Sequence, residues 1–231
     1  MTIILGIFIR DSFGNGEIIF ASDGRAMECE TANNGKSTTR LRSEDIDKIR
    51  KLTPEICIGY AGNCSELFED VYKELKDKIS EMIKENLESF TKRMREIILE
   101  IKNTERYIKI EKESGPLIHK FIVGGAYNDT LVLIRLHSGD EYKIKKTEFL
   151  SFPDISYLVD GATEEVHKKV EIILDEKLLQ IQNFDGISNK IVYIIRYVIS
   201  KASELHPHIN NHVFIRRFSR KFDLERYIGY E

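Results

Sequence analysis

The sequence is poor in the residues that mark several common classes of protein. It holds only 3 cysteines, an odd and small number that excludes a disulfide framework and fits a reducing compartment such as the cytoplasm. Its 4 prolines and 14 glycines form no low-complexity segment. Basic residues do not outnumber acidic ones, so the net charge is -3 and the isoelectric point is near 6.1. The composition therefore gives no general reason to expect a nucleic-acid partner.

Long apolar runs are also missing, so we expect no membrane-spanning segment. The opening apolar run, residues 2–9, ends at Arg10. No basic segment precedes this run and no small-residue cleavage site follows it, which argues against a signal peptide. The run is better interpreted as a buried β-strand, and we expect a cytoplasmic protein.

Hydrophobic residues make up 42% of the chain, enough to form a sizeable core. Their spacing changes along the sequence from strand-like to helical and back. Residues 65–106 predict two helices, with Ser89 capping the second, whereas the polar residues 27–44 predict a long exposed loop. The predicted strands are 2–10, 16–23, 47–52, 55–62, 119–126, 130–137, 141–146 and 212–218, and two more helices carry Val166, Val170, Ile173 and Leu174, then Ile191, Ile194, Ile195 and Val198.

This order of elements predicts an α+β fold with antiparallel sheets and helix pairs packed outside them. No change of composition marks a linker. We therefore expect one domain over residues 2–231, in which residues 219–231 form a charged C-terminal tail.

Three short stretches stand behind the opening Met-Thr. They are "FASDGRAM" (20–27), "DIDKIRKL" (45–52) and "CIGYAGNCSE" (57–66). Taken singly, each has an ordinary structural explanation, such as a turn or a solvated charge. In this order behind Thr2 they resemble the proteasome β-type family of N-terminal nucleophile (Ntn) hydrolases, and within it the bacterial HslV branch. The likeness extends more weakly through "FIVGGA", "YLVDGATEE" and the last helix pair.

The resemblance implies a four-layer αββα sandwich and a threonine hydrolase acting on peptide or amide bonds through an acyl-enzyme. Removal of Met1 exposes Thr2, whose hydroxyl is the nucleophile and whose α-amine is the base. A free α-amine has a pKa of about 7.7–8.0, which suits a base near neutral pH. The same likeness implies a peptide or protein substrate and no cofactor.

Lys48 is implied to sit beside Thr2 as a cation, where its charge lowers the pKa of the amine. A buried lysine needs an anion, and Asp23 is the candidate. The amide of Gly62, at a strand-to-helix turn, is implied to donate to the oxyanion. Arg25 is interpreted as structural, tying the Asp23 turn to a neighbour. The main specificity pocket is implied to be lined by Ala26, Ile46, Tyr60 and Cys64, with Tyr60 as its floor.

Two segments depart from the family pattern. Asp160 stands at or near the place of a serine that contacts the N-terminal amine, and a carboxylate there raises the pKa of the amine. The segment before the last strand reads "HPHINNH" where the family has an aspartate and a serine. Its His206, His208 and His212 form a weak candidate metal site, although a solvated loop is the ordinary interpretation. The basic run 216–221 is likewise a weak candidate for nucleic-acid binding.

Two alternatives to a hydrolase stay open. One is an inactive ring or scaffold subunit of the same fold, and the other is a transpeptidase or ligase that uses the same acyl-enzyme with an amine acceptor. A scaffold has little reason to keep a buried Lys–Asp pair, which favours an active site. The family forms rings of six or seven subunits fed by a separate ATPase, so the resemblance also implies a homo-oligomer.

Overall fold

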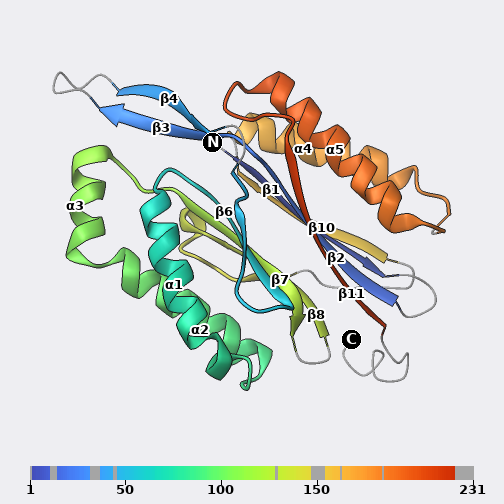
Figure 1. Cartoon of the computed structure of the whole chain (residues 1–231), viewed down its shortest axis with the longest axis horizontal. Helices are drawn as coiled ribbons and strands as arrows, with labels where there is room; N and C mark the ends of the chain where they lie inside the picture. The colour runs from blue at the N-terminus through green and yellow to red at the C-terminus, as the bar shows by residue number, and fades with distance from the viewer. Residues whose placement is uncertain are drawn as a thin grey trace.

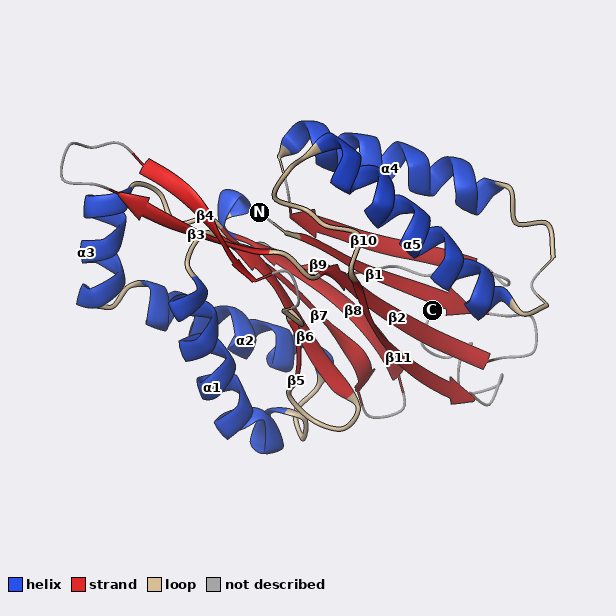
Figure 2. Cartoon of the chain, turned by 45° about the horizontal axis from the view of Figure 1, so that its top comes forward, coloured by secondary structure: helices blue, strands red, loops and turns tan. Residues whose placement is uncertain are grey.

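The computed structural model describes residues 2–10, 15–31, 37–43, 46–127, 130–146, 154–161, 163–183 and 185–221. They form four layers in which two antiparallel sheets are stacked face to face and a set of helices covers each outer face (Figures 1 and 2). The fold is therefore α+β and has the αββα order expected from the sequence.

The first sheet has the strand order β10-β1-β2-β11, and all neighbours are antiparallel. Both faces of β1 are buried, because its alternating residues contact different layers. Ile4 and Phe8 pack toward the second sheet, and Ile3 and Leu5 pack toward helices. The bounds are β1 (Ile3–Arg10), β2 (Asn15–Asp23), β10 (Asp154–Gly161) and β11 (Val213–Lys221).

The second sheet runs β5-β6-β7-β8-β9, also antiparallel throughout. Its central strand, β7, is buried along almost its whole length. Ile122 and Leu133 meet Ile4 and Phe20 of the first sheet, so one apolar layer fills the space between the sheets. The bounds are β5 (Ile49–Lys51), β6 (Ile56–Gly62), β7 (His119–Tyr127), β8 (Thr130–His137) and β9 (Lys145–Lys146).

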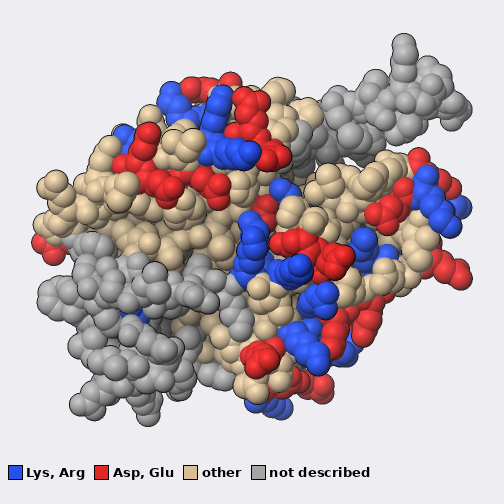
Figure 3. Space-filling model, turned by 180° about the vertical axis from the view of Figure 1, so that it is seen from behind, with Lys and Arg blue, Asp and Glu red and all other residues tan. Residues whose placement is uncertain are grey.

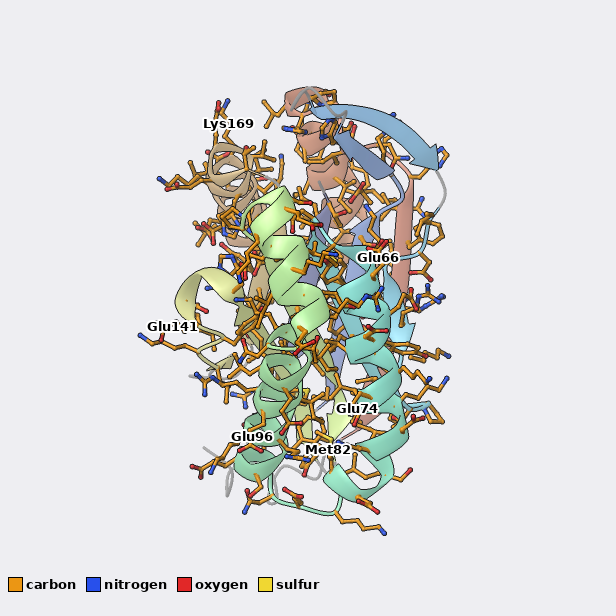
Figure 4. The ribbon with its side chains drawn as sticks, turned by 90° about the vertical axis from the view of Figure 1, so that its left-hand side faces the viewer. Glu66, Glu74, Met82, Glu96, Glu141 and Lys169 are labelled. Atoms are coloured by element: carbon orange, nitrogen blue, oxygen red, sulfur yellow. The ribbon has the colours of Figure 1, made fainter. Side chains whose placement is uncertain are left out.

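The helices cover the outer faces with amphipathic sides. Helices α1 (Ser65–Met82) and α2 (Leu87–Lys102) lie on the second sheet, and α3 (Glu105–Ser114) packs beside them. Helices α4 (Glu164–Leu179) and α5 (Ile187–Leu205) lie on the first sheet. Figure 4 shows α1 and α2 side by side, with Met82 near the turn that joins them. No helix among these described segments is long and apolar enough to cross a membrane.

The predicted order of strands, helix pair, strands, helix pair and strand is confirmed, with an added helix, an added hairpin and the strand β10, which was not predicted. The expected loop at 27–44 is wrong, because β3 (Ala26–Thr31) and β4 (Ser37–Ser43) form an antiparallel hairpin. Its sequence alternates apolar and charged residues in "MECE", a strand pattern that the polar composition hides. Figure 1 shows this hairpin projecting from the end of the molecule where β1 begins.

Three predictions in the middle of the chain are also wrong. Three helices, not two, follow β6, because α3 is mostly charged and buries only Tyr107 and so gives a weak periodic signal. The side chain of Asn86, not Ser89, caps α2 by accepting the Ser89 N–H. The strand expected at 141–146 shrinks to β9, because Glu141 and Tyr142 have positive φ angles of 57° and turn the chain after the short helix η1 (Ser138–Asp140).

Candidate active site

Thr2 lies directly before β1, at the end of the first sheet where β2 ends at Asp23. Thr2 is buried, with 8% of its surface exposed. The pairing of β1 with β2 sets Ile4 opposite Ser22, which brings Asp23 beside the Thr2–Ile3 peptide. The Ile3 N–H donates to Asp23 Oδ1 at 2.9 Å. This hydrogen bond therefore fixes the Thr2–Ile3 peptide to the end of β2.

Asp23 is fully buried and its carboxylate accepts three hydrogen bonds. Besides the Ile3 N–H, the Arg25 N–H donates to Oδ2 at 3.0 Å and Lys48 Nζ donates to Oδ1 at 2.9 Å. A buried carboxylate needs such donors, because its desolvation is costly when they are missing. Asp23 thus holds Lys48 and the start of β1 through one oxygen atom.

Lys48 precedes β5 and is held at both ends. Its carbonyl accepts the Tyr60 N–H at 3.2 Å, and its Nζ donates to the Arg25 carbonyl at 2.5 Å as well as to Asp23. Burial lowers the pKa of the Lys48 ammonium from its ordinary value, while the charge and hydrogen bond of Asp23 oppose this change. The sequence prediction that Lys48 pairs with Asp23 is confirmed by this geometry.

Gly62 ends β6 and is exposed, three residues before α1. A Cβ at this position would meet the Tyr60 hydroxyl and the Ile118 carbonyl, so the close approach of these groups requires glycine. Asn63 fixes the turn that follows, because its N–H donates to the Ile118 carbonyl at 3.1 Å and its side-chain oxygen accepts the Ile118 N–H at 2.8 Å. These two hydrogen bonds tie the turn to Ile118, the residue before β7.

The residues predicted to line a pocket are only partly described. Tyr60 and Cys64 contact each other, since the Tyr60 hydroxyl donates to the Cys64 carbonyl at 2.6 Å and accepts the Cys64 N–H at 3.2 Å. The Tyr60 ring stacks on Phe68 at 4.8 Å, and burial raises its pKa. Ile46 is half-buried, and the side chain of Ala26 is outside the described part. That these residues line a pocket stays a prediction.

Asp160 is buried on the other side of Thr2, in β10. Lys120 Nζ lies 3.1 Å from its Oδ1, and Arg135 Nε lies 3.8 Å from its Oδ2. Both cations come from the second sheet, and the sequence analysis did not single them out. The carboxylate therefore faces the space between the sheets, where Lys120 and Arg135 surround it.

The "HPHINNH" segment packs against the Asp23 turn. Asn210, which sequence reasoning missed, is buried and accepts the Gly24 N–H at 2.9 Å, and the Arg25 guanidinium donates to the Pro207 carbonyl. This contact agrees with the structural role expected for Arg25. Burial lowers the pKa of His206 and of His208.

The candidate metal site receives no geometric support. His206 Nδ1 accepts the His208 N–H at 3.2 Å, which orients that ring toward the backbone. His212 is exposed. Within the part of the chain that the structure describes, no group of three or more His, Cys, Asp or Glu residues is placed to hold a metal ion.

Two residues of the basic run 216–221, Arg216 and Arg217, pair with acidic neighbours. Arg216 pairs with Asp47, and Arg217 Nε lies 2.6 Å from Glu17 Oε1. Figure 3 shows basic and acidic side chains interspersed over the described surface on the far side of the molecule. Neither observation favours a nucleic-acid interface.

The stacked sheets and their helix layers define the fold of the Ntn hydrolases. Solved structures with this fold include eukaryotic HslV from Trypanosoma brucei, with a TM-score of 0.57 and 14% identity over 94% of this chain and 99% of that chain. Anbu, an ancestral beta-subunit from Yersinia bercovieri, has a TM-score of 0.60 and 14% identity over 93% of this chain and 81% of that chain. At such identity the likeness shows the fold alone. Comparison with protein-family models finds no match, and comparison with curated proteins finds none either.

Proposed function

We propose that the chain is a threonine-type Ntn hydrolase that cleaves peptide or amide bonds. Removal of Met1 gives Thr2 a free α-amine, which takes the proton of its own Oγ as Oγ attacks the substrate carbonyl. The Gly62 N–H donates to the oxyanion that develops. The proton then goes to the leaving amine, and water releases the acyl group from the Thr2 ester.

The observation that carries this proposal is the oxygen shared at Asp23. Oδ1 accepts both the Ile3 N–H and Lys48 Nζ, each at 2.9 Å, so the ammonium lies within two hydrogen bonds of the Thr2–Ile3 peptide. A cation held there disfavours a second positive charge on the Thr2 amine and keeps more of it in the base form. The proposed nucleophile needs this arrangement, whereas the stability of the fold does not require it.

The remaining features of the proposal follow from the family resemblance. We propose that residues 2–231 form one proteasome-β-like domain in a cytoplasmic homo-oligomeric ring that a separate ATPase can feed. The expected start of the C-terminal tail at residue 219 is wrong, because β11 continues to Lys221. The pocket formed by Ala26, Ile46, Tyr60 and Cys64 selects the substrate residue. An acceptor amine in place of water turns the same acyl-enzyme toward transpeptidation.

Two measurements on the purified protein test the proposal. Intact mass should show that Met1 is absent, and a peptide epoxyketone should add one equivalent to the wild-type chain. Thr2→Ala is the matched control, since a small second residue still permits Met1 removal and leaves a free amine but no hydroxyl. Retention of Met1 in most molecules, or equal labelling of the Thr2→Ala variant, would overturn the hydrolase and favour the inactive scaffold.

A further inference from the structure

The apolar layer between the two sheets changes character at one end. Over most of its area it is built from buried Ile, Leu, Phe and Ala side chains. At the end near Thr2 it contains charged side chains instead. In the strand register, Lys120 lies opposite His137, Arg135 opposite Ile122, and Asp160 opposite Ile4. Lys120, Arg135 and Asp160 form what we call the cross-sheet cluster.

The cross-sheet cluster connects strands of different sheets. Asp160 is only 1% exposed, and the side chains of Lys120 and Arg135 are 15% exposed. The cations lie 3.1 Å and 3.8 Å from its two oxygens, and Arg135 also lies 3.8 Å from Asp140. Strand β10 packs on β7 and β8 at this point. Because β10 belongs to the first sheet and the cations to the second, the cluster fixes the spacing of the layers here.

The end of β10 that carries Asp160 also contacts Thr2. Gly161 pairs with Ile3 and has a φ of 111°, a conformation that only glycine adopts without strain. A Cβ on Gly161 would run into the Thr2 carbonyl, so the two backbones are in close contact. Asp160 Oδ1 accepts the Gly161 N–H at 3.0 Å. One carboxylate oxygen is thus bound both to the opposite sheet and to the peptide that abuts Thr2.

We propose that Asp160 is a positioning residue that fixes Thr2 through Gly161, with Lys120 and Arg135 as its anchors in the opposite sheet. It therefore acts on the geometry of Thr2 and not as a partner of its amine. The inference rests on the proposed function, since it explains how the nucleophile of that reaction is held. Small displacements of a reacting group lower rates steeply, by up to about a hundredfold for 1 Å.

The charge-balanced double variant Asp160→Asn/Lys120→Met tests this role. It removes one charge of each sign, so the field at the Thr2 amine changes little while the tie between the sheets is lost. We expect the second-order rate of epoxyketone labelling to fall at least about tenfold at every pH. The pH of half-maximal labelling should stay within about 0.3 units of wild type, because a field effect would move it.

Two controls accompany the double variant. Lys120→Arg keeps the cation and should label within about threefold of wild type. Glu17→Gln breaks the ion pair between the buried Glu17 and the exposed Arg217 at the far end of β2, so it should lower stability without changing the labelling rate of the folded protein. Both controls separate positioning of Thr2 from a general loss of structure.

The outcomes are distinct. A double variant that labels within twofold of wild type overturns the positioning role, as does one that keeps its maximal rate and shifts its pH midpoint. Hydrogen exchange of the Ile3 amide gives a readout independent of activity, and it should be faster in the double variant than in Glu17→Gln. If wild type lacks Met1 and still does not label, the proposed function fails, while faster Ile3 exchange would still support the positioning of Thr2.

Discussion

Two buried lysine–carboxylate pairs flank Thr2, and they differ in how fully each carboxylate is satisfied. Asp23 accepts three hydrogen bonds, two of them from backbone amides, and its lysine also binds the Arg25 carbonyl. Asp160 Oδ1 accepts the Gly161 N–H and lies 3.1 Å from Lys120 Nζ, but its Oδ2 has no hydrogen-bond partner among the described residues. The first pair is fully organised around the start of the chain, whereas the second is a looser tie between two sheets.

The difference indicates separate roles. Buried ion pairs contribute little net stability compared with apolar packing, so two of them at one end of a sandwich need another explanation. Lys48 is held by the Asp23 carboxylate and the Arg25 carbonyl, and Asp23 opposes the lowering of its pKa by burial, which favours the cation that the proposed mechanism needs. Lys120 reaches across the layers, as expected of an anchor. The contrast predicts that substitutions of the two lysines have unequal effects.

The largest effect is expected from Lys48→Ala compared with Lys120→Met. Lys48→Ala should abolish epoxyketone labelling, because the Thr2 amine loses the charge that favours its base form and Asp23 is left unpaired. Its free energy of unfolding should fall by about 3–5 kcal/mol, the usual cost of breaking a buried pair. Lys120→Met should keep measurable labelling, at a rate lowered about tenfold.

Labelling rates and urea unfolding at neutral pH measure both effects. The comparison collapses if Lys48→Ala labels at nearly the wild-type rate, or if the two variants lose labelling to the same extent. Either result would mean that Lys48 does not act on the Thr2 amine as proposed.

The first pair could be predicted from the sequence and the second could not. Asp23 and Lys48 stand in short motifs at strand ends, and their order behind Thr2 matches a known pattern, so sequence alone brought them together. Lys120 and Arg135 lie in runs that read as ordinary strands. Their contact with Asp160 depends on how one sheet stacks on the other, which no periodicity in a single strand reveals. Asn210 was missed for a similar reason, since only its burial against Gly24 marks it.

The fold shows the same division. Strong apolar periodicity predicted β1, β2, β6, β7, β8 and the helices α1, α2, α4 and α5. The hairpin β3–β4 and helix α3 were not predicted because their residues are mostly polar and leave no clear apolar period, and α3 buries only Tyr107.

A buried group with a neutral partner, His119, sharpens the contrast with the charged pairs. It adjoins Lys120 in β7 but points to the opposite face, where its Nδ1 lies 3.3 Å from the Tyr60 hydroxyl. Burial, with a smaller contribution from Lys102, lowers its pKa to about 4. The unfolded chain therefore binds a proton near pH 6.5 that the folded chain refuses until about pH 4, and stability falls as the pH drops through this window.

The loss attributable to His119 should reach roughly 3 kcal/mol at about pH 4. His119→Gln cannot bind the proton, so its free energy of unfolding should change less between pH 7 and pH 4 than that of wild type. Urea unfolding across this range measures the difference. Parallel curves for the two proteins would show that the acid response comes from other groups and not from His119.

The smallest effect is expected from Tyr60→Phe, which removes one hydroxyl from an uncharged cluster on the same side of the site. That hydroxyl binds both the N–H and the carbonyl of Cys64, the residue that precedes α1. Its loss should lower the free energy of unfolding by about 1–2 kcal/mol, since a buried amide loses its partner while the ring stays stacked on Phe68. Labelling should change less than about twofold, because neither lysine–carboxylate pair is touched.

Urea unfolding and labelling of the same preparation check both numbers. The matched control is Tyr72→Phe, which removes an exposed hydroxyl bound to the Lys51 carbonyl. A tenfold loss of labelling in Tyr60→Phe alone would mean that the start of α1, and with it the Gly62 turn, depends on Tyr60 as closely as Thr2 depends on the charged pairs.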